Sequence, residues 1–155
     1  MGALNDDRLY RCLDVALPYK EAIEECMAGI GRNWFGQSYR HLLYDLTSTC
    51  FEGQMEANPK ARRGYCRDHR PDCRQILIGA VVDREGYPVG YEVLPGNTRD
   101  EKTVAGMLDR LRDRFGAADR TLCMDRGMVT AESLKVIRAS QVNYVLADRR
   151  TASQP

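Results

Sequence analysis

Two aspartates stand where a carboxylate needs a physical reason. Asp45 lies inside the apolar and β-branched run LLYDLTSTCF (42–51), and Asp125 ends a second apolar run, TLCMD. Aspartate is depleted from strand interiors, and a buried carboxylate must be paired or bound to a cation. Taken alone, Asp125 is equally well explained as a turn or capping residue before Arg126 and Gly127. If the two runs are neighbouring strands, the carboxylates converge and could hold Mg²⁺ or Mn²⁺, which prefer oxygen ligands.

A cluster of cations forms a second candidate site. Residues 60–74 contain more basic than acidic side chains and show no hydrophobic periodicity. The basic residues are Lys60, Arg62, Arg63, Arg67, His69, Arg70 and Arg74. They could neutralise DNA phosphates while Tyr65 stacks on a base, although a solvated polar loop has the same composition. Arg126 is a further candidate for a phosphate contact. The net charge of the chain, +1, gives no argument for nucleic acid.

Cysteine and histidine in the same segment allow a zinc site as an alternative. Cys66, His69 and Cys73 would supply three ligands and Cys50 the fourth, but the spacing fits no usual zinc pattern. None of the six cysteines forms a CxxC pair, so we expect free thiols in a reducing compartment. The chain has no apolar run long enough to span a bilayer, and its polar N-terminus is unlike a signal peptide. We therefore expect a cytoplasmic protein.

The elements that position these residues follow from hydrophobic periodicity. Residues 1–36 are expected to be a helical lead-in, with two short helices from Asp7 to about Ile30 that are separated by Pro18 and closed by Gly29, Gly31 and the sequence GRNWFG (31–36). Strands are expected at 42–51, 75–83 and 87–94, the last two joined by a short glycine-containing turn. The stretch between the first two strands has no pattern and is predicted to be a long mobile loop.

The second half alternates helices and apolar strands. Thr98 is the expected N-cap of a helix with Glu101 at its third position, and Asn97 belongs to the preceding turn. Strands at 121–125 and 143–147 flank a helix capped by Thr130. The order β-β-β-α-β-α-β predicts an antiparallel three-strand meander plus two parallel strands, with flanking helices. One closure places the fourth strand beside the first and brings Asp45 and Asp125 together.

Three strings carry a resemblance to a known family. The sequences YDLTSTCFEG, RRGYCRDHRPDCRQILIGAVVDREGYPVGYEVLPGNTRDEKT and CMDRGMVTAESL resemble, in order and spacing, the catalytic core of DDE transposases of bacterial insertion sequences. The resemblance covers roughly residues 7 to 150. It implies an α/β, ribonuclease H-like mixed sheet at 37–150. The last residues show no pattern, and 151–155 are expected to be an unstructured tail. It also implies three acidic residues that hold two divalent ions (Mg²⁺ or Mn²⁺), which drive strand nicking and strand transfer at transposon ends.

Two of the three acidic residues have counterparts here. The resemblance assigns the first to Asp45 and the second to Asp125, as metal ligands and catalytic residues. The third, a glutamate on a later helix, has no counterpart, so the domain is expected to be C-terminally truncated and its isolated activity to be low. Glu92, Asp100 and Asp148 could be substitutes. We instead ascribe Glu92 to the exposed face of an outer strand, Asp100 to helix N-terminal charge preference and Asp148 to a strand end.

These observations leave three functional hypotheses. The first is an incomplete DNA transposase that acts on transposon ends and target DNA and forms a homo-oligomer in its full-length form. The second is a noncatalytic DNA-binding or dimerisation remnant of a transposase. The third is a metal-dependent nuclease with a rearranged third ligand. Asn97, Thr98 and Arg126 would support the metal site or the DNA in the first hypothesis.

Overall fold

The computed structural model describes residues 5–65, 70–115 and 120–147. It divides into two compact units, Met1–Gln37 and Ser38–Pro155. The tail expected at 151–155 lies outside the described residues, and the domain boundaries drawn from the sequence stay a prediction. In the described part of the chain, no helix is long and apolar enough to cross a membrane.

The first unit consists of helices α1 (Asp6–Ala16) and α2 (Lys20–Phe35), joined by the 3₁₀ turn η1 (Leu17–Tyr19). Pro18 is accommodated because it lies at the start of that turn, where its missing N–H has no required partner. Of the signals expected to close α2, Gly29 and Gly31 do not end the helix, whereas the last glycine of GRNWFG does. The helix runs on to Phe35 and ends at Gly36, whose φ of 62° permits the left-handed C-cap. An interior glycine costs only about 1 kcal/mol, which is too little to end a helix.

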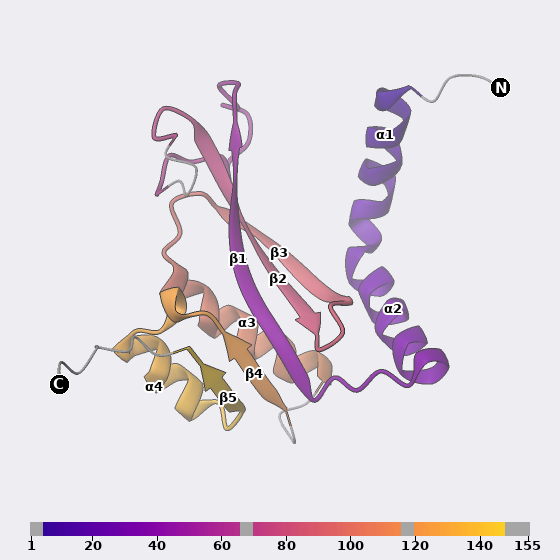
Figure 1. Ribbon diagram of the computed structural model, residues 1–155. Coiled ribbons are helices and arrows are strands. Elements are labelled where there is room, and N and C mark those ends of the chain that lie inside the picture. Colours follow the sequence, from indigo (N-terminus) through magenta and orange to yellow (C-terminus); the bar gives the residue numbers. More distant parts are fainter. Residues whose placement is uncertain (1–4, 66–69, 116–119, 148–155) are drawn as a thin grey trace. The chain divides into compact units, whose positions relative to one another are not determined.

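The second unit contains one five-stranded sheet (Figure 1). Its strands are β1 (His41–Phe51), β2 (Arg74–Asp83), β3 (Pro88–Pro95), β4 (Thr121–Met124) and β5 (Asn143–Leu146). They lie in the order β3-β2-β1-β4-β5. The pairs β1/β2 and β2/β3 are antiparallel, whereas β1/β4 and β4/β5 are parallel. This arrangement confirms the ribonuclease H-like sheet expected from the sequence, including the fourth strand beside the first.

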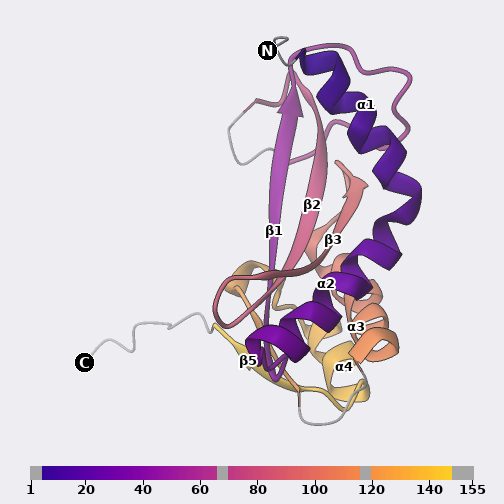
Figure 2. The ribbon, with the colours of Figure 1, turned by 90° about the vertical axis from the view of Figure 1, so that its right-hand side faces the viewer.

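Two helices, α3 (Asp100–Phe115) and α4 (Ala131–Ala139), cover one face of this sheet (Figure 2). Val104 and Ile137 are fully buried under them. Thr130 caps α4 as expected, because its side chain accepts the N–H of Ser133 at 3.1 Å. The expected N-cap of α3 is wrong, since the helix begins at Asp100, two residues after Thr98.

The opposite face of the sheet carries apolar side chains without a cover from the second unit's described helices. Leu43, Tyr91 and Val145 on this face are 42%, 43% and 58% exposed. We call this the open face, and the other the helix face. The distinction fixes where each candidate residue can act, because successive side chains along a strand point to opposite faces.

Candidate functional site

Asp45 lies on the open face, near the middle of β1. Its neighbours Tyr44 and Leu46 are 2% and 1% exposed on the helix face, whereas Asp45 itself is exposed. One carboxylate oxygen, Oδ1, accepts the N–H of Leu46 at 2.9 Å. The sequence argument assumed a buried carboxylate, and the structure shows an exposed one. It is a strand-interior carboxylate on an uncovered surface, where solvent, a cation or a large substrate can reach it.

Asp125 follows directly on the last residue of β4. The parallel register pairs Tyr44 with Met124, so Asp45 and Asp125 are the next residues on two neighbouring strands. Paired positions of adjacent strands lie about 4.8 Å apart. The backbone oxygen of Asp125 accepts the N–H of Met128 at 3.2 Å, which starts the 3₁₀ turn η2 (Arg126–Met128). Two exposed carboxylates thus come to adjacent register positions at the carboxyl end of β4.

No third carboxylate joins this pair among the residues that the structure describes. A search of them for three or more His, Cys, Asp or Glu side chains able to hold a metal finds no such group. Glu92 pairs in register with Gly79, a helix-face position, and its carboxylate forms an ion pair of 2.7 Å with Arg110 of α3. The expectation that Glu92 lies on an exposed face is wrong, because the covering helix reaches it. Asp148 and the side chain of Asp100 lie outside the described residues.

The basic segment after β1 is partly described, and its described part is hydrogen-bonded to β2. Residue 62 forms a two-bond backbone bridge with Gln75 at the start of β2, at 3.0 and 2.9 Å. Gln75 is 1% exposed, and its side-chain Nε2 donates to the carbonyl oxygens of Tyr65 at 2.9 Å and Gly96 at 2.7 Å. The prediction of a long mobile loop is wrong for this part, because a buried glutamine side chain fixes it to the sheet.

The cations of the segment differ in how much of their charge is free. Lys60 donates from Nζ to the backbone oxygen of Val93 at 2.7 Å and keeps its full charge, since its partner is neutral. Arg62 and Arg63 are exposed. Arg67, His69 and the side chain of Arg126 lie outside the described residues. Lys60, Arg62 and Arg63 therefore lie near the Gln75 anchor on a fixed piece of backbone.

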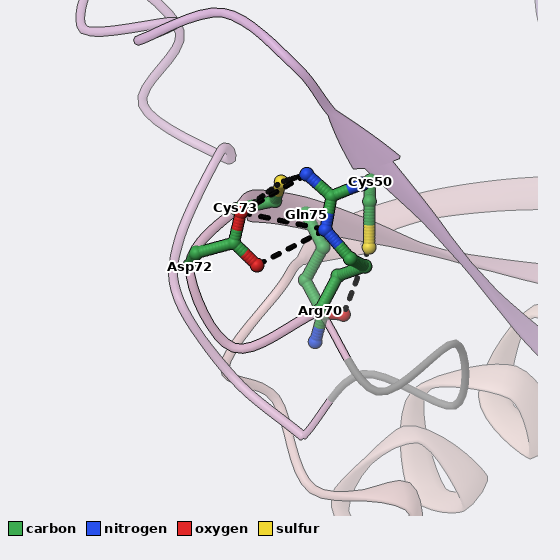
Figure 3. A network of polar contacts seen from close by, with 5 residues as sticks. All are labelled: Cys50, Arg70, Asp72, Cys73 and Gln75. Carbon is green, nitrogen blue, oxygen red and sulfur yellow. Dashed lines mark hydrogen bonds and ion pairs between the residues drawn. The ribbon is translucent and has the colours of Figure 1, made fainter.

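Arg70 is engaged in a compact polar network (Figure 3). Its guanidinium contacts both carboxylate oxygens of Asp72 at 3.0 Å, and the Cys73 thiol lies 3.0 Å from Nη2. The hydrogen bond from Arg70 lowers the pKa of Asp72 well below its usual range. Burial, followed by the hydrogen bond to Asp72, raises the pKa of the Cys73 thiol. The Arg70 charge is thus largely matched locally, which leaves it less to offer a phosphate.

Two of the four ligands proposed for zinc, Cys50 and Cys73, lie among the described residues. Cys66 and His69 lie outside the described residues. Cys73 belongs to the network with Asp72, and the Cys50 thiol contacts the Gln75 side-chain oxygen at 3.9 Å (Figure 3). The thiols of Cys50 and Cys73 thus have different polar partners in the part of the chain that is described.

A cleft of about 420 Å³ opens on the helix face, beyond the end of β4. Leu46, Ser48 and Leu77 of the sheet form one wall, and Tyr65 and Arg99 line it from the connecting segments. It also reaches the glycine of the turn that follows Asp125. The cleft exists because β1 extends several residues past β4 and leaves a free edge there (Figure 1).

Comparison with protein families decides the identity of this arrangement. The model of the transposase DDE domain matches residues 36–153, well over half of the chain, and includes both Asp45 and Asp125. The chain belongs to the DDE transposase family. The match confirms the family that the sequence resemblance indicated.

Several solved structures are similar to this DDE transposase chain, and none of the curated proteins matches it. The catalytic domain of Mos1 mariner transposase has 15% identity over 97% of this chain and 65% of that one, with a TM-score of 0.47. The Mos1 transposase paired-end complex with left transposon end has 16% identity over 92% and 43%, with a TM-score of 0.46. The piggyBac transposase synaptic complex with hairpin DNA has 14% identity over 77% and 25%, with a TM-score of 0.43. This chain spans less than two thirds of the length of each.

Sequence reasoning missed two features of this candidate site. The anchoring role of Gln75 had a signal, because the residue lies two positions before Leu77 and therefore on the same core-facing side of β2. The cleft had none, because it forms where segments near residues 48, 65, 77 and 99 meet.

Proposed function

We propose that this chain is part of a DDE transposase in which Asp45 and Asp125 hold divalent cations, Mg²⁺ or Mn²⁺, for DNA strand nicking and strand transfer at insertion-sequence ends. One observation carries the proposal: two exposed carboxylates occupy adjacent register positions on neighbouring strands of a domain in this family. Two carboxylates without nitrogen or sulfur ligands suit hard cations. Bound there, such ions would activate an attacking water or hydroxyl and stabilise the leaving oxygen.

The protein's own residues would position DNA around the carboxylate pair. Lys60, Arg62 and Arg63 sit on anchored backbone and can neutralise phosphates, which fixes a strand without reading its sequence. Arg67, His69, Arg70 and Arg126 belong to the same proposed contact surface. Within that set Arg70 contributes least, since Asp72 holds its guanidinium.

A third carboxylate would complete the site, and we propose that it comes from outside the described residues. Two carboxylates hold a divalent ion weakly, so strand transfer by the isolated chain should be slow or absent. Metal binding is thus a sharper test of the pair than turnover.

The test uses iron in place of magnesium. Fe²⁺ with ascorbate and peroxide cleaves backbone close to its binding site, and mass spectrometry locates the cuts. We expect cuts in β1 and after β4, suppressed by excess Mg²⁺ and lost in Asp45→Asn and in Asp125→Asn. The control Asp113→Asn alters an exposed aspartate of α3 and should leave the cuts unchanged. Cuts at the same places in both site variants would refute the assignment.

Plasmid nicking with Mn²⁺, Mg²⁺ or EDTA then tests incompleteness. We expect little nicking by the chain alone, together with DNA binding that weakens as salt increases. Robust nicking that disappears in both Asp45→Asn and Asp125→Asn would show that this chain alone supplies every ligand that nicking needs, and would contradict the low activity expected of it.

The second candidate is a noncatalytic DNA-binding or dimerisation module. The apolar repeat in the first unit supports a role in dimerisation. Its apolar positions alternate in steps of four and three residues, the spacing of a coiled-coil seam. They are Leu9, Leu13 and Ala16 in α1 and Ile23, Met27, Ile30 and Trp34 in α2, and the turn η1 interrupts the repeat between the two helices. All but Ala16 are at least 38% exposed. A second copy of the same seam would bury them and give the homo-oligomer expected of the full-length protein.

Light scattering coupled to size-exclusion chromatography tests this seam. Met27→Glu places a charge in it and should lower the apparent mass from dimer to monomer. The control Arg11→Glu adds a negative charge on the outer side of α1 and should leave the dimer intact. A chain that is monomeric before any substitution would contradict the dimer.

A further inference from the structure

The cleft on the helix face lies one strand position away from the proposed metal site. Asp45 and Leu46 are consecutive in β1, so the carboxylate points to the open face while Leu46 forms part of the cleft wall. Gly127, two residues after Asp125, lines the same cleft. Since β4 ends at Met124, the edge of β1 beyond it has no strand partner on that side among the described residues. A DNA strand at the two carboxylates can therefore pass around this edge to reach the cleft.

The lining of the cleft suits a flat, partly polar group. Leu46 and Leu77 are 1% and 6% exposed and offer an apolar wall. Tyr65, 82% exposed, presents an aromatic ring, and the guanidinium of Arg99 can also stack on a π-system. Asn97 and Thr98 line the cleft as well, so its wall combines apolar, aromatic and hydrogen-bonding side chains.

Ser48 gives the cleft an unused polar group. Its Oγ is buried and has no hydrogen-bond partner in the described structure, yet the residue lines the cleft. A buried hydroxyl without a partner is costly, and a ligand that supplies an acceptor or donor at this point removes the cost. The edge of a nucleobase carries both kinds of group. The volume of about 420 Å³ lies in the range of sites that enclose small planar ligands.

We propose that this cleft receives one unpaired nucleobase of the DNA strand that runs past Asp45 and Asp125. This inference rests on the proposed function. It adds a contact with a base, whereas the carboxylate pair would act only on the DNA backbone. The base stacks against Tyr65 and its edge meets Ser48. Extrusion of a base costs least where the duplex is already open or frayed, so the cleft favours DNA ends with unpaired nucleotides.

Two single-stranded oligonucleotides with equal numbers of phosphates test the proposal. One is an oligothymidylate, and the other carries abasic residues at the same positions, so that only the bases differ. Fluorescence anisotropy at one salt concentration should show about tenfold tighter binding of the oligothymidylate. Tyr65→Ala should reduce this preference to within about twofold. The matched control Tyr87→Ala, in the hairpin at the other end of β2, should leave it unchanged.

A second variant, Ser48→Met, fills the cleft from its wall and should remove the same preference. Should that variant fail to fold, photo-crosslinking with 5-iodouracil oligonucleotides replaces it, and the adduct is expected on Tyr65. Equal binding of both oligonucleotides would overturn the base cleft and leave the proposed DNA function intact. Absence of binding to either would overturn the proposed function, and this inference with it. A preference that survives in both Tyr65→Ala and Ser48→Met would place the base elsewhere and refute the assignment.

Discussion

Replacement of Gln75 by leucine should release the anchored part of the basic segment. Its buried side chain donates to the carbonyl oxygens of Tyr65 and Gly96, at 2.9 and 2.7 Å. Gln75→Leu keeps the size of the side chain but removes both hydrogen bonds. Each is worth about 1 kcal/mol net, and a carbonyl left buried without a partner adds a further cost. We therefore expect a loss of about 2 to 4 kcal/mol in the free energy of unfolding.

Urea denaturation measures this loss. With a slope of about 2 kcal/mol per molar urea, typical of small proteins, the midpoint should fall by about 1 to 2 M. The matched control Gln54→Leu alters an exposed glutamine of the same connecting segment and should shift the midpoint little. Trypsin should also cut faster at Arg62 and Arg63 in the Gln75 variant, because their backbone is no longer fixed. A Gln75→Leu midpoint within error of the control would refute the anchoring role.

Other substitutions and chemical probes give further predictions for the same region. Gly96→Ala should destabilise the domain by about 1 to 3 kcal/mol, because the added Cβ would lie 2.6 Å from the backbone oxygen of Arg62; Gly53→Ala, with open space around it, should be neutral or slightly stabilising in the same thermal melt. Burial raises the pKa of the Cys73 thiol, so less of it is thiolate at pH 8, and iodoacetamide should modify it about tenfold more slowly than the exposed Cys12, as followed by peptide mass spectrometry. Equal rates for the two thiols would contradict that protection.

The sheet order was predictable because local patterns and a general topological rule agree. Three apolar runs joined by a long connection and a short turn predict a meander, and alternating helices and strands predict right-handed parallel crossovers. Together they left few closures, and the observed one places β4 beside β1. Asp45 and Asp125 become neighbours as a direct result of this order. Their neighbourhood was therefore predictable from strand order alone, although their exposure was not.

The errors share a physical origin in contacts between segments distant along the chain. Gly29 and Gly31 locally favour a helix end, but their modest cost did not stop α2. Glu92 was assigned to the exposed face of an outer strand, and only the position of α3 shows that Arg110 contacts it on the helix face. The loop prediction failed because one side chain, Gln75, bonds to two segments separated by about thirty residues. Propensity and periodicity carry no information on such pairings.

The proposed metal site and the proposed base cleft lie on opposite faces of the sheet. Asp45 faces the open side because β1 alternates, and Leu46 and Ser48 face the helix side for the same reason. A third carboxylate that completes the site must therefore lie on the open face. Glu92 could reach that face only if the β2/β3 register shifted by one residue. The cleft, in contrast, needs only the free edge of β1 and the segments anchored by Gln75. Metal binding and base binding should thus be separable by mutation, since Asp45 and Asp125 are assigned to the metal and Ser48 and Tyr65 to the base.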